Sequence, residues 1–475
     1  MAGPITLDPT NDNPLTITST GIVTTVGAGD GIDGAAPTSP PWTVSNSGNV
    51  SAASGDGFNL SGGATLTNNA GGTITSSGTH GLGLGVGTAL YIKSGSGNVT
   101  NNGSISGGGY GVALGGGGSV TNTSSITGAE DAVRISGGVG TISNSGTLTG
   151  TFDDTIGLFS GGSITNASGG LITSSGTAGA AIYTSNGGAT NINNSGTITA
   201  TYHAVVVEGG GTVTNSQGGT ITGQNTGVFV KKVAASVNNS GMISGTGTVS
   251  GTVTNGTGVY LMNNGSVTNN STGTITGLVF GAFLEGGAGT VSNSGSIAGT
   301  NADGVVLGLG GTVINNPSGH ITGGSTGVYV KYRAAGTVTN SGNIAGTAAS
   351  STGVDLAGGG VVTNNAGGSI TGGANGVFVG SSATATPTSS VGPMIGTVSN
   401  SGNIVGGKYA GVSLSKGGTV TNLSGGTIAG VSNGVYVSAG ASGTVSNTGS
   451  IVSTGTAGAG VDLGGGGTVT NNSGG

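Results

Sequence analysis

The chain has 475 residues, of which 112 are glycine, with eight lysines and arginines against fourteen aspartates and glutamates and a net charge of −6. So few basic residues argue against nucleic acid as a partner, and the absence of cysteine excludes disulfides and thiolate metal sites. The glycines show no G-X-Y period, which excludes collagen, and with many Val, Ile and Thr residues they favour strands and turns over helices.

The N-terminal sequence MAGPITLDPTNDN has neither the basic region nor the apolar region of a signal peptide, and no run of about 18 apolar residues is expected to span a bilayer as a helix. We interpret residues 1–42 as a degenerate first coil or cap with a connecting loop. In ITSTGIVTT (17–25), Ser19 takes the position that asparagine occupies in later repeats. Residues 43–475 then form one repetitive domain, which is truncated in its last coil.

From residue 43 onward, a triplet of an apolar residue, any residue and asparagine recurs, mostly at intervals of 21 to 25 residues. Each repeat holds three short apolar alternations separated by glycine turns, as in TVT, NIA and GVDL within 337–356. A unit this short cannot enclose a core alone, but stacked units bury a continuous one. The pattern therefore predicts an all-β fold: a single-stranded parallel β-helix, or β-solenoid, of about 18 coils with three short strands each.

The asparagine that closes the first alternation recurs at one register of the repeat. At the spacing of roughly 4.8 Å between parallel strands, its amides can hydrogen-bond from coil to coil as an asparagine ladder. A glycine-rich turn also favours asparagine by itself, but recurrence at one register favours the ladder. The predicted ladder consists of Asn46, Asn68, Asn101, Asn122, Asn144, Asn166, Asn194, Asn215, Asn239, Asn269, Asn293, Asn315, Asn340, Asn364, Asn400, Asn422, Asn447 and Asn471.

The alternating TVTNSG (337–342) and GVYL (258–261) or GVDLGGGG (460–467) units resemble the repetitive β-helical passenger domains of bacterial autotransporters, which belong to type V secretion. The first copies, AGDGIDG and WTVSNSGNVS within 28–51, also resemble the start of such passengers. The resemblance covers essentially the whole chain. It implies a right-handed β-helix that is exported across the outer membrane and displayed on the cell surface. The sequence does not include the translocating β-barrel of such proteins, so membrane attachment is an expectation from the resemblance.

In the third alternation of the repeat, the outward residue is aromatic in many coils, which predicts an aromatic stripe along one face. Two interpretations remain open: a contact surface for sugar rings or another copy of the chain, or rings covered by the loops KKVAAS (231–236) and KYRAAG (331–336). The basic residues of these loops would then be cation–π partners or solvated charges: Lys231, Lys232, Lys331 and Arg333. The candidate stripe consists of Tyr183, Phe229, Tyr260, Phe283, Tyr329, Phe378 and Tyr436.

The three histidines, His80, His203 and His320, fall in different coils without the spacing of metal ligands. We expect all three to be solvent-facing and inert.

Two doublets, Glu130–Asp131 and Asp153–Asp154, are candidates for the paired carboxylates of acid–base catalysis. Adjacent residues on a strand point to opposite faces, so we expect no shared site and no cluster of acids with a basic residue.

Asp30, Asp33 and Asp56 offer the oxygen ligands that Ca²⁺ prefers. They do not recur coil after coil, however, which favours a turn-forming role. We therefore expect no catalytic, cofactor-binding or metal-binding residues.

Together with the resemblance, these features predict a non-catalytic stalk or adhesin-like passenger domain, displayed at the outer membrane, that contributes to adhesion. Its partners would be glycans or proteins on host or neighbouring-cell surfaces. The alternative is a self-assembling extracellular filament, because the open ends of a solenoid expose unpaired backbone groups for end-to-end stacking, and side-by-side association is also open. An ice-binding or polysaccharide-acting β-helix is less favoured, since Ser, Asn and Ala interrupt the outward T-x-T rows.

Overall fold

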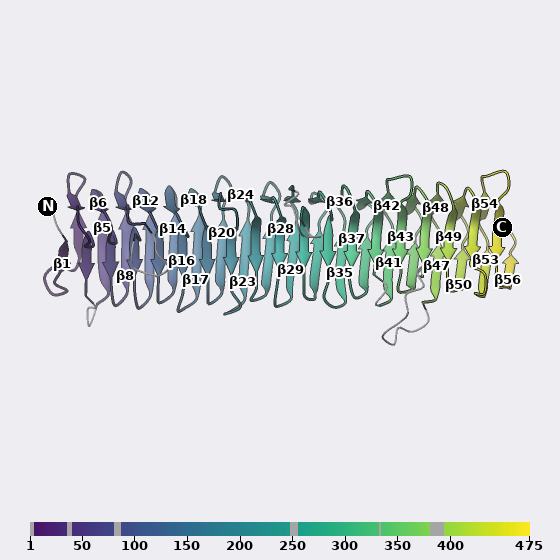
Figure 1. The fold of residues 1–475 in the computed structure, drawn as a ribbon, viewed down its shortest axis with the longest axis horizontal. Coiled ribbons are helices and arrows are strands. Elements are labelled where there is room, and N and C mark those ends of the chain that lie inside the picture. Colours follow the sequence, from purple (N-terminus) through teal and green to yellow (C-terminus); the bar gives the residue numbers. More distant parts are fainter. Residues whose placement is uncertain (1–3, 36–39, 80–86, 248–254, 332–333, 381–393) are drawn as a thin grey trace. The chain divides into compact units, whose positions relative to one another are not determined.

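The computed structural model describes residues 4–35, 40–79, 87–247, 255–331, 334–380 and 394–475 (Figure 1). Every regular element in these ranges is a β-strand, and the strands form three parallel sheets with three strands per coil and about 18 coils. The predicted all-β solenoid is therefore confirmed. No helix in the described ranges has the length and hydropathy needed to cross a membrane.

The chain divides into two compact units, Met1–Val233 and Ala234–Gly475. We number the sheets in the order in which a repeat visits them. The first sheet holds strands that end in asparagine, except the most N-terminal one, which ends at Ile17. The second holds those of the type T-I-T-G, and the third holds those of the type G-V-x-L.

In unit 1, the first sheet comprises β2 (Leu15–Ile17), β5 (Trp42–Asn46), β8 (Ala64–Asn68), β11 (Gly97–Asn101), β14 (Gly118–Asn122), β17 (Gly140–Asn144), β20 (Gly162–Asn166), β23 (Thr190–Asn194) and β26 (Gly211–Asn215). The second comprises β3 (Ile22–Thr25), β6 (Asn49–Ala52), β9 (Thr73–Ser76), β12 (Ser104–Gly107), β15 (Ser125–Gly128), β18 (Thr147–Gly150), β21 (Leu171–Ser174), β24 (Thr197–Ala200) and β27 (Thr220–Gly223). The third comprises β1 (Ile5–Leu7), β4 (Ile32–Gly34), β7 (Phe58–Leu60), β10 (Leu90–Ile92), β13 (Val112–Leu114), β16 (Val133–Ile135), β19 (Ile156–Leu158), β22 (Ala180–Thr184), β25 (His203–Val207) and β28 (Thr226–Val230).

In unit 2, the first sheet comprises β29 (Ala235–Asn239), β32 (Gly265–Asn269), β35 (Gly289–Asn293), β38 (Gly311–Asn315), β41 (Gly336–Asn340), β44 (Gly360–Asn364), β47 (Gly396–Asn400), β50 (Gly418–Asn422), β53 (Gly443–Asn447) and β56 (Gly467–Asn471). The second comprises β30 (Met242–Gly245), β33 (Thr274–Gly277), β36 (Ser296–Gly299), β39 (His320–Gly323), β42 (Asn343–Gly346), β45 (Ser369–Gly372), β48 (Asn403–Gly406), β51 (Thr427–Gly430) and β54 (Ser450–Ser453). The third comprises β31 (Thr257–Leu261), β34 (Ala282–Leu284), β37 (Asp303–Leu307), β40 (Thr326–Val330), β43 (Thr352–Leu356), β46 (Asn375–Val379), β49 (Ala410–Leu414), β52 (Asn433–Val437) and β55 (Ala459–Leu463).

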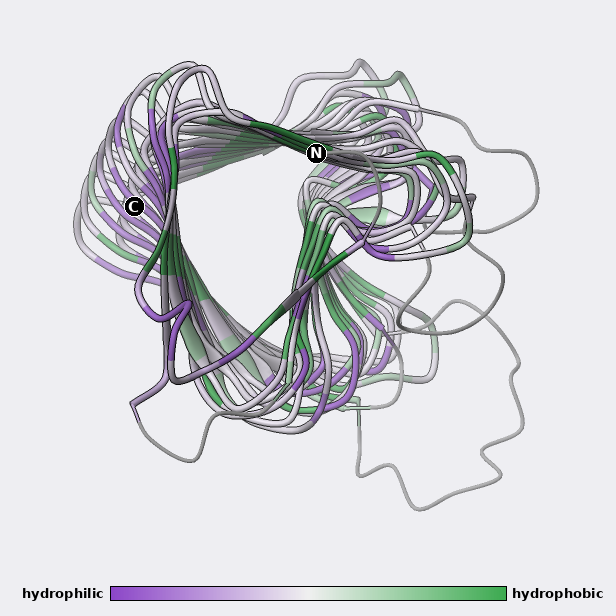
Figure 2. Ribbon diagram, turned by 90° about the vertical axis from the view of Figure 1, so that its left-hand side faces the viewer, coloured by the Kyte–Doolittle hydropathy of each residue, from purple (hydrophilic) through white to green (hydrophobic). Residues whose placement is uncertain are grey.

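The core of each unit is built from the inward residues of the three alternations. In one coil, Val338, Ile344, Val354 and Leu356 are all completely buried. Each stacks in register on an equivalent residue, as Val338 does on Val362. Hydrophobic residues accordingly recur along the stacked strands (Figure 2). Burying a Val or Ile side chain stabilises a fold by roughly 1.5–3 kcal/mol, so the repeated inward positions supply most of the stability.

The glycine that precedes the inward valine of the third strand is required by the close approach of neighbouring coils. A Cβ on Gly353 would lie 2.6 Å from the carbonyl oxygen of Gly376 and 2.7 Å from Cγ2 of Ile370. Both distances are shorter than van der Waals contact, so a side chain there would push the coils apart. This explains why glycine precedes the inward valine in so many repeats.

The degenerate segment at the N-terminus stacks on the coil that follows it. Strand β1 pairs with β4, β2 with β5, and β3 with β6, all in parallel. The expected register of this segment is wrong, because Ile17 and not Ser19 pairs with Asn46. Ile17 is also buried, so this coil places an apolar side chain at the end of its first strand.

Candidate functional site

The predicted ladder asparagines stand at the end of the first-sheet strands, where the chain turns toward the second sheet. In unit 1, Nδ2 of each asparagine from Asn46 to Asn194 donates to Oδ1 of the next, at 2.8–2.9 Å. In unit 2, the same bond joins each asparagine from Asn239 to Asn471, again at 2.8–2.9 Å. The asparagines are buried, apart from Asn471, which is exposed.

Asn340 illustrates how fully these amides are used. Its Nδ2 donates to Oδ1 of Asn364 at 2.8 Å, to the carbonyl of Gly342 at 3.1 Å and to the carbonyl of Ser369 at 3.1 Å. Its Oδ1 accepts from the backbone N–H of Gly342 and from Nδ2 of Asn315. No bonding capacity is left for a ligand, so the ladder holds the coils together and is not a binding site.

A second column of side chains, most of them polar, lies at the corner between the second and third sheets, which we call the third-sheet corner. Here a carboxylate or amide oxygen accepts the backbone N–H of the next coil, as Asp30 does from Asp56, at 2.7 Å, and Asp154 from Ala180, also at 2.7 Å. The residues at this corner are Asp30, Asp56, Thr88, Tyr110, Asp131, Asp154, Ala180, His203 and Thr226 in unit 1, and Thr257, Phe280, Asp303, Thr326, Thr352, Asn375, Ala410, Asn433 and Ala459 in unit 2.

The candidate Ca²⁺ ligands Asp30 and Asp56 are engaged at this corner. Asp30 also accepts from Nδ2 of Asn59, and Asp56 accepts from the N–H of Thr88. Asp33 lies instead on β4, paired with Asn59 on β7. In the described residues, these three carboxylates do not form a group close enough to share a metal ion.

The expectation that no acids cluster with a basic residue is wrong. Carboxylate oxygens of Asp131, Asp153 and Asp154 lie within 4.8 Å of one another, and Arg134 donates to Asp131 at 3.2 Å. Alternation failed as a guide because Asp131 and the Asp153–Asp154 doublet precede β16 and β19 and lie in the corner, not on strands. Glu130 also lies outside a strand, beside Asp131.

Burial dominates the electrostatics of this acidic corner. Asp131 is 2% exposed, and burial, together with the charge of Asp154, raises its pKa well above the usual value. Burial also raises the pKa of Asp154 to about 7. Asp131 forms an ion pair with Arg134, and Asp154 accepts the N–H of Ala180. Asp153 is the exposed member of the group.

On the outer face of the third sheet in unit 1, aromatic rings and one cation pack on each other. The guanidinium carbon of Arg134 lies 4.0 Å from the ring centroid of Phe159 and 5.4 Å from that of Tyr110. Phe159 in turn lies 6.0 Å from Tyr183, between centroids. Phe159 occupies the space above Gly157, where a Cβ would meet its ring at 2.9 Å. Tyr183 is consequently half-buried.

The expectation that His203 is solvent-facing is wrong. Its ring lies at the third-sheet corner between Tyr202, at 4.1 Å, and Phe229, at 4.9 Å. Burial lowers the pKa of His203 to about 4. His320 is exposed, as expected, and His80 lies outside the described residues.

Basic residues near the predicted stripe form ion pairs and a cation–π contact. Lys231 and Lys232 both bind the carboxylate of Glu208, at 3.2 and 2.7 Å. The ammonium of Lys331 lies 4.4 Å from the ring centroid of Phe283, which makes this ring a cation–π partner. Arg333 lies outside the described residues.

In unit 2, the stripe residues also pack on each other. Tyr260 stacks on Phe283 with centroids 5.1 Å apart, and Phe280 lies 5.3 Å from Phe283. The hydroxyl of Tyr260 donates to the carboxylate of Glu285. Tyr260 and Phe283 are buried, whereas the remaining stripe residues are half-buried: Tyr329, Phe378 and Tyr436 in this unit, and Phe229 in unit 1.

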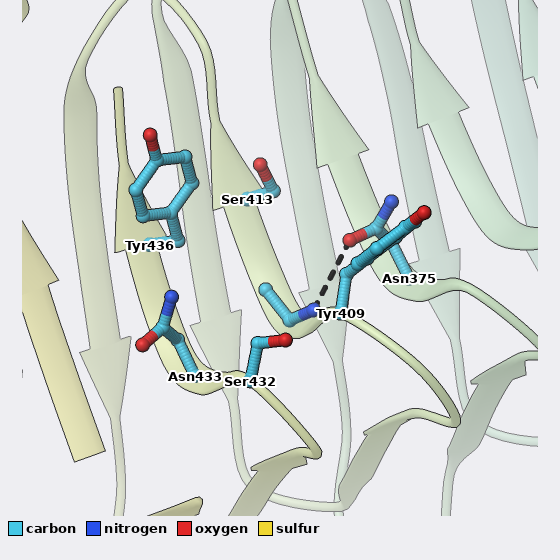
Figure 3. Close-up of a pocket in the computed structure, with 7 residues that line it drawn as sticks. Asn375, Tyr409, Ser413, Ser432, Asn433 and Tyr436 are labelled. Carbon is cyan, nitrogen blue, oxygen red and sulfur yellow. Dashed lines mark hydrogen bonds between the residues drawn. The ribbon is translucent and has the colours of Figure 1, made fainter. Parts of the chain in front are cut away.

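A groove opens on the third sheet of unit 2, with a volume of about 250 Å³. It is lined by Asn375, Tyr409, Ala410, Ser413, Ser432, Asn433 and Tyr436. In Figure 3, the rings of Tyr409 and Tyr436 lie on either side of Ser413. The stripe prediction included Tyr436 but missed Tyr409, whose signal is an aromatic residue directly before the corner, as Tyr202 is before His203.

The chain matches no family model, no curated protein sequence and no solved structure.

Proposed function

We propose that the chain is a non-catalytic passenger or stalk, displayed on a bacterial cell surface, that contributes to adhesion. The observation that carries this proposal is the concentration of aromatic side chains on the outer face of the third sheet. Around them the exterior consists largely of Thr, Ser, Asn and Gly, which offer few specific contacts. In unit 2, the exposed Tyr409 and the half-buried Tyr436 present ring surface to solvent, and aromatic surface within a polar exterior is typical of a contact site.

The acidic groups support a structural role better than a catalytic one. Asp30, Asp56 and Asp154 each accept a backbone N–H from the next coil, and Asp131 is paired with Arg134. A general acid or base needs to reach a substrate, and these carboxyls are committed to the protein itself. The likeness of the repeats to autotransporter passengers supports display outside the cell.

Adhesion is tested with the purified chain coupled to fluorescent beads. We expect several-fold more beads on bacterial and epithelial cells than for beads that carry albumin, and the excess should vanish when the chain is heat-denatured before coupling. Equal numbers for native and denatured chain would contradict the proposal. Protease treatment of intact producing cells tests display, because a surface protein is cleaved while cytoplasmic markers remain intact.

The alternative of an end-to-end filament is tested by electron microscopy over a range of concentrations. A stalk should remain as separate particles, whereas fibres that lengthen with concentration would favour self-assembly.

A further inference from the structure

The groove on the third sheet of unit 2 is built from three successive coils. Asn375 begins β46, Ala410 and Ser413 belong to β49, and Asn433 and Tyr436 belong to β52. Its volume of about 250 Å³ is just below the range of roughly 300–1,000 Å³ that is usual for small-molecule sites. The groove therefore suits one small ring and not an extended chain.

Two tyrosines supply flat apolar walls. Tyr409 is 49% exposed, which is unusual for so large a ring in this chain, and Tyr436 is half-buried at the outward position of β52. Ser413 lies between them and pairs in register with Tyr436. The C–H groups on one face of a sugar ring are apolar, and they pack favourably on the faces of aromatic rings.

Two asparagines supply oriented hydrogen-bond donors. Oδ1 of Asn375 accepts the N–H of Ala410 at 3.2 Å, and Oδ1 of Asn433 accepts the N–H of Ala459 at 3.3 Å. Because the backbone fixes each amide oxygen, the amide nitrogen points away from the N–H that the oxygen accepts, as Figure 3 shows for Asn375. Each Nδ2 then presents donors that match the hydroxyl oxygens of a sugar.

Acceptors lie beside these donors. Ser432 donates its hydroxyl hydrogen to the carbonyl of Lys408 at 3.2 Å, which leaves the lone pairs of its Oγ to accept a hydroxyl hydrogen. Ser413 adds a second hydroxyl at the centre of the groove. The lining therefore combines donors, acceptors and aromatic faces, which is what a polyhydroxylated ring requires.

The lining contains no Asp, Glu, Lys, Arg or His residue. Of the nearby charges, the ammonium of Lys408 lies 5.1 Å from the ring centroid of Tyr409, and Asp462 pairs in register with Tyr436. One cation and one anion at the edges give no preference for a charged ligand.

We propose that this groove binds a single uncharged monosaccharide ring of a neutral glycan, held between Tyr409 and Tyr436 and hydrogen-bonded by Asn375 and Asn433. This inference rests on the proposed adhesive function and names the ligand class that the adhesive face recognises.

The test is binding of the methyl glycosides of glucose, galactose, mannose and N-acetylglucosamine to the full chain, measured by saturation-transfer NMR and calorimetry. We expect at least one to bind with a dissociation constant in the low-millimolar range, as suits a ligand of about a dozen non-hydrogen atoms. Methyl glucuronide and sialic acid serve as charged probes. Binding of the charged sugars alone, or of none of the sugars, would overturn the inference.

Variants locate the site. Tyr409→Ala should weaken binding at least tenfold, and because Tyr409 is exposed the variant should fold with an unchanged circular dichroism spectrum. Asn433→Leu should weaken it similarly by removing a donor. Phe152→Ala removes a ring that is 72% exposed in unit 1 and belongs neither to the stripe nor to the groove, so it should leave sugar affinity unchanged. Equal affinity in the Tyr409→Ala variant and the parent chain would overturn the inference.

The bead assay separates this inference from the proposed function. If beads that carry the Tyr409→Ala chain lose adhesion, and a bound glycoside competes with the parent beads, both proposals are supported. If the Tyr409→Ala beads adhere like the parent beads and no glycoside binds, the inference fails while adhesion stands. If a glycoside binds in the groove but parent beads do not adhere, the ligand class is supported and the adhesive function fails.

Discussion

The two polar corners of a coil hold their neighbours by different chemistry. At the end of the first sheet, one residue type recurs, and every described ladder bond is alike at 2.8–2.9 Å. At the third-sheet corner, the residue is aspartate, threonine, tyrosine, histidine or asparagine in most coils and alanine or phenylalanine in the others. The uniform corner has no spare hydrogen-bonding capacity, whereas the variable corner borders both the acidic cluster and the groove.

An amide can both donate and accept, so identical asparagines extend a ladder through any number of coils. An ionised carboxylate only accepts, so two aspartates in successive coils cannot bond to each other and instead repel. Burial and its neighbour Asp154 accordingly raise the pKa of Asp131, while burial and Asp30 raise that of Asp56. The ladder thus stabilises the stack, whereas the third-sheet corner holds buried carboxyls whose ionised form is disfavoured.

The largest effect should come from placing a carboxylate in the ladder. Asn340→Asp removes three donated hydrogen bonds and buries a charge, so we expect a loss of about 3–5 kcal/mol in the free energy of unfolding of unit 2 at pH 8. The measurement is urea unfolding followed by circular dichroism. Thr337→Asp, an exposed position on the same strand, is the control and should change stability little. Equal stability of both variants would refute the role given to the ladder.

The next effect probes the acidic cluster. Arg134→Met leaves Asp131 buried without its cation, and we expect a loss of roughly 3 kcal/mol at pH 8. The loss should shrink as the pH falls, because burial raises the pKa of Asp131 well above its usual value. The double variant Arg134→Met/Asp131→Asn removes both charges and should recover most of this loss. If the double variant were as unstable as the single one, packing of the guanidinium on Phe159 would be the dominant contribution.

A third effect is a stability that falls with rising pH. Burial raises the pKa of Asp56, Asp154 and Asp355 to about 7 and that of Asp303 to about 6. In the unfolded chain aspartate titrates near 3.9, so between about pH 4 and pH 7 the folded chain binds more protons. This contribution to stability is complete below about pH 4 and is lost as the pH rises through 6 to 7.

His203 opposes this trend, because its pKa is lowered to about 4 and its contribution is lost as the pH falls toward that value. Four carboxyls outweigh one imidazole, so melting temperatures should be higher at pH 4.5 than at pH 8. Asp56→Asn should raise stability by roughly 1–2 kcal/mol at pH 8 and have little effect at pH 4.5. A melting temperature that rises steadily from pH 4.5 to pH 8 would show that these carboxyls are ionised in the folded chain.

The contrast between the corners also explains what the sequence can predict. The ladder could be predicted because asparagine recurs at one register of the repeat, from Asn46 to Asn471. The strands that carry it also share one alternation of inward and outward residues. The cluster of Asp131, Asp153 and Asp154 could not be predicted, because these residues lie in a corner, where the alternation of a strand does not apply. Tyr409 was missed for the same reason, since its approach to Tyr436 depends on how two successive corners align.

The smallest effect compares the same residue type at both corners of unit 2. Asn375 accepts one backbone N–H, from Ala410, whereas Asn340 takes part in five hydrogen bonds. Asn375→Ala should therefore cost about 1 kcal/mol, and Asn340→Ala about 3 kcal/mol, in urea unfolding measured under the same conditions. Asn375→Asp keeps the acceptor and should restore most of the stability lost in Asn375→Ala, while Asn340→Asp should be worse than Asn340→Ala. If the two asparagines responded alike to both substitutions, the distinction between the corners would fail.

An amide that bonds only through its oxygen contributes little to stability, and its nitrogen then remains available to donate to a ligand.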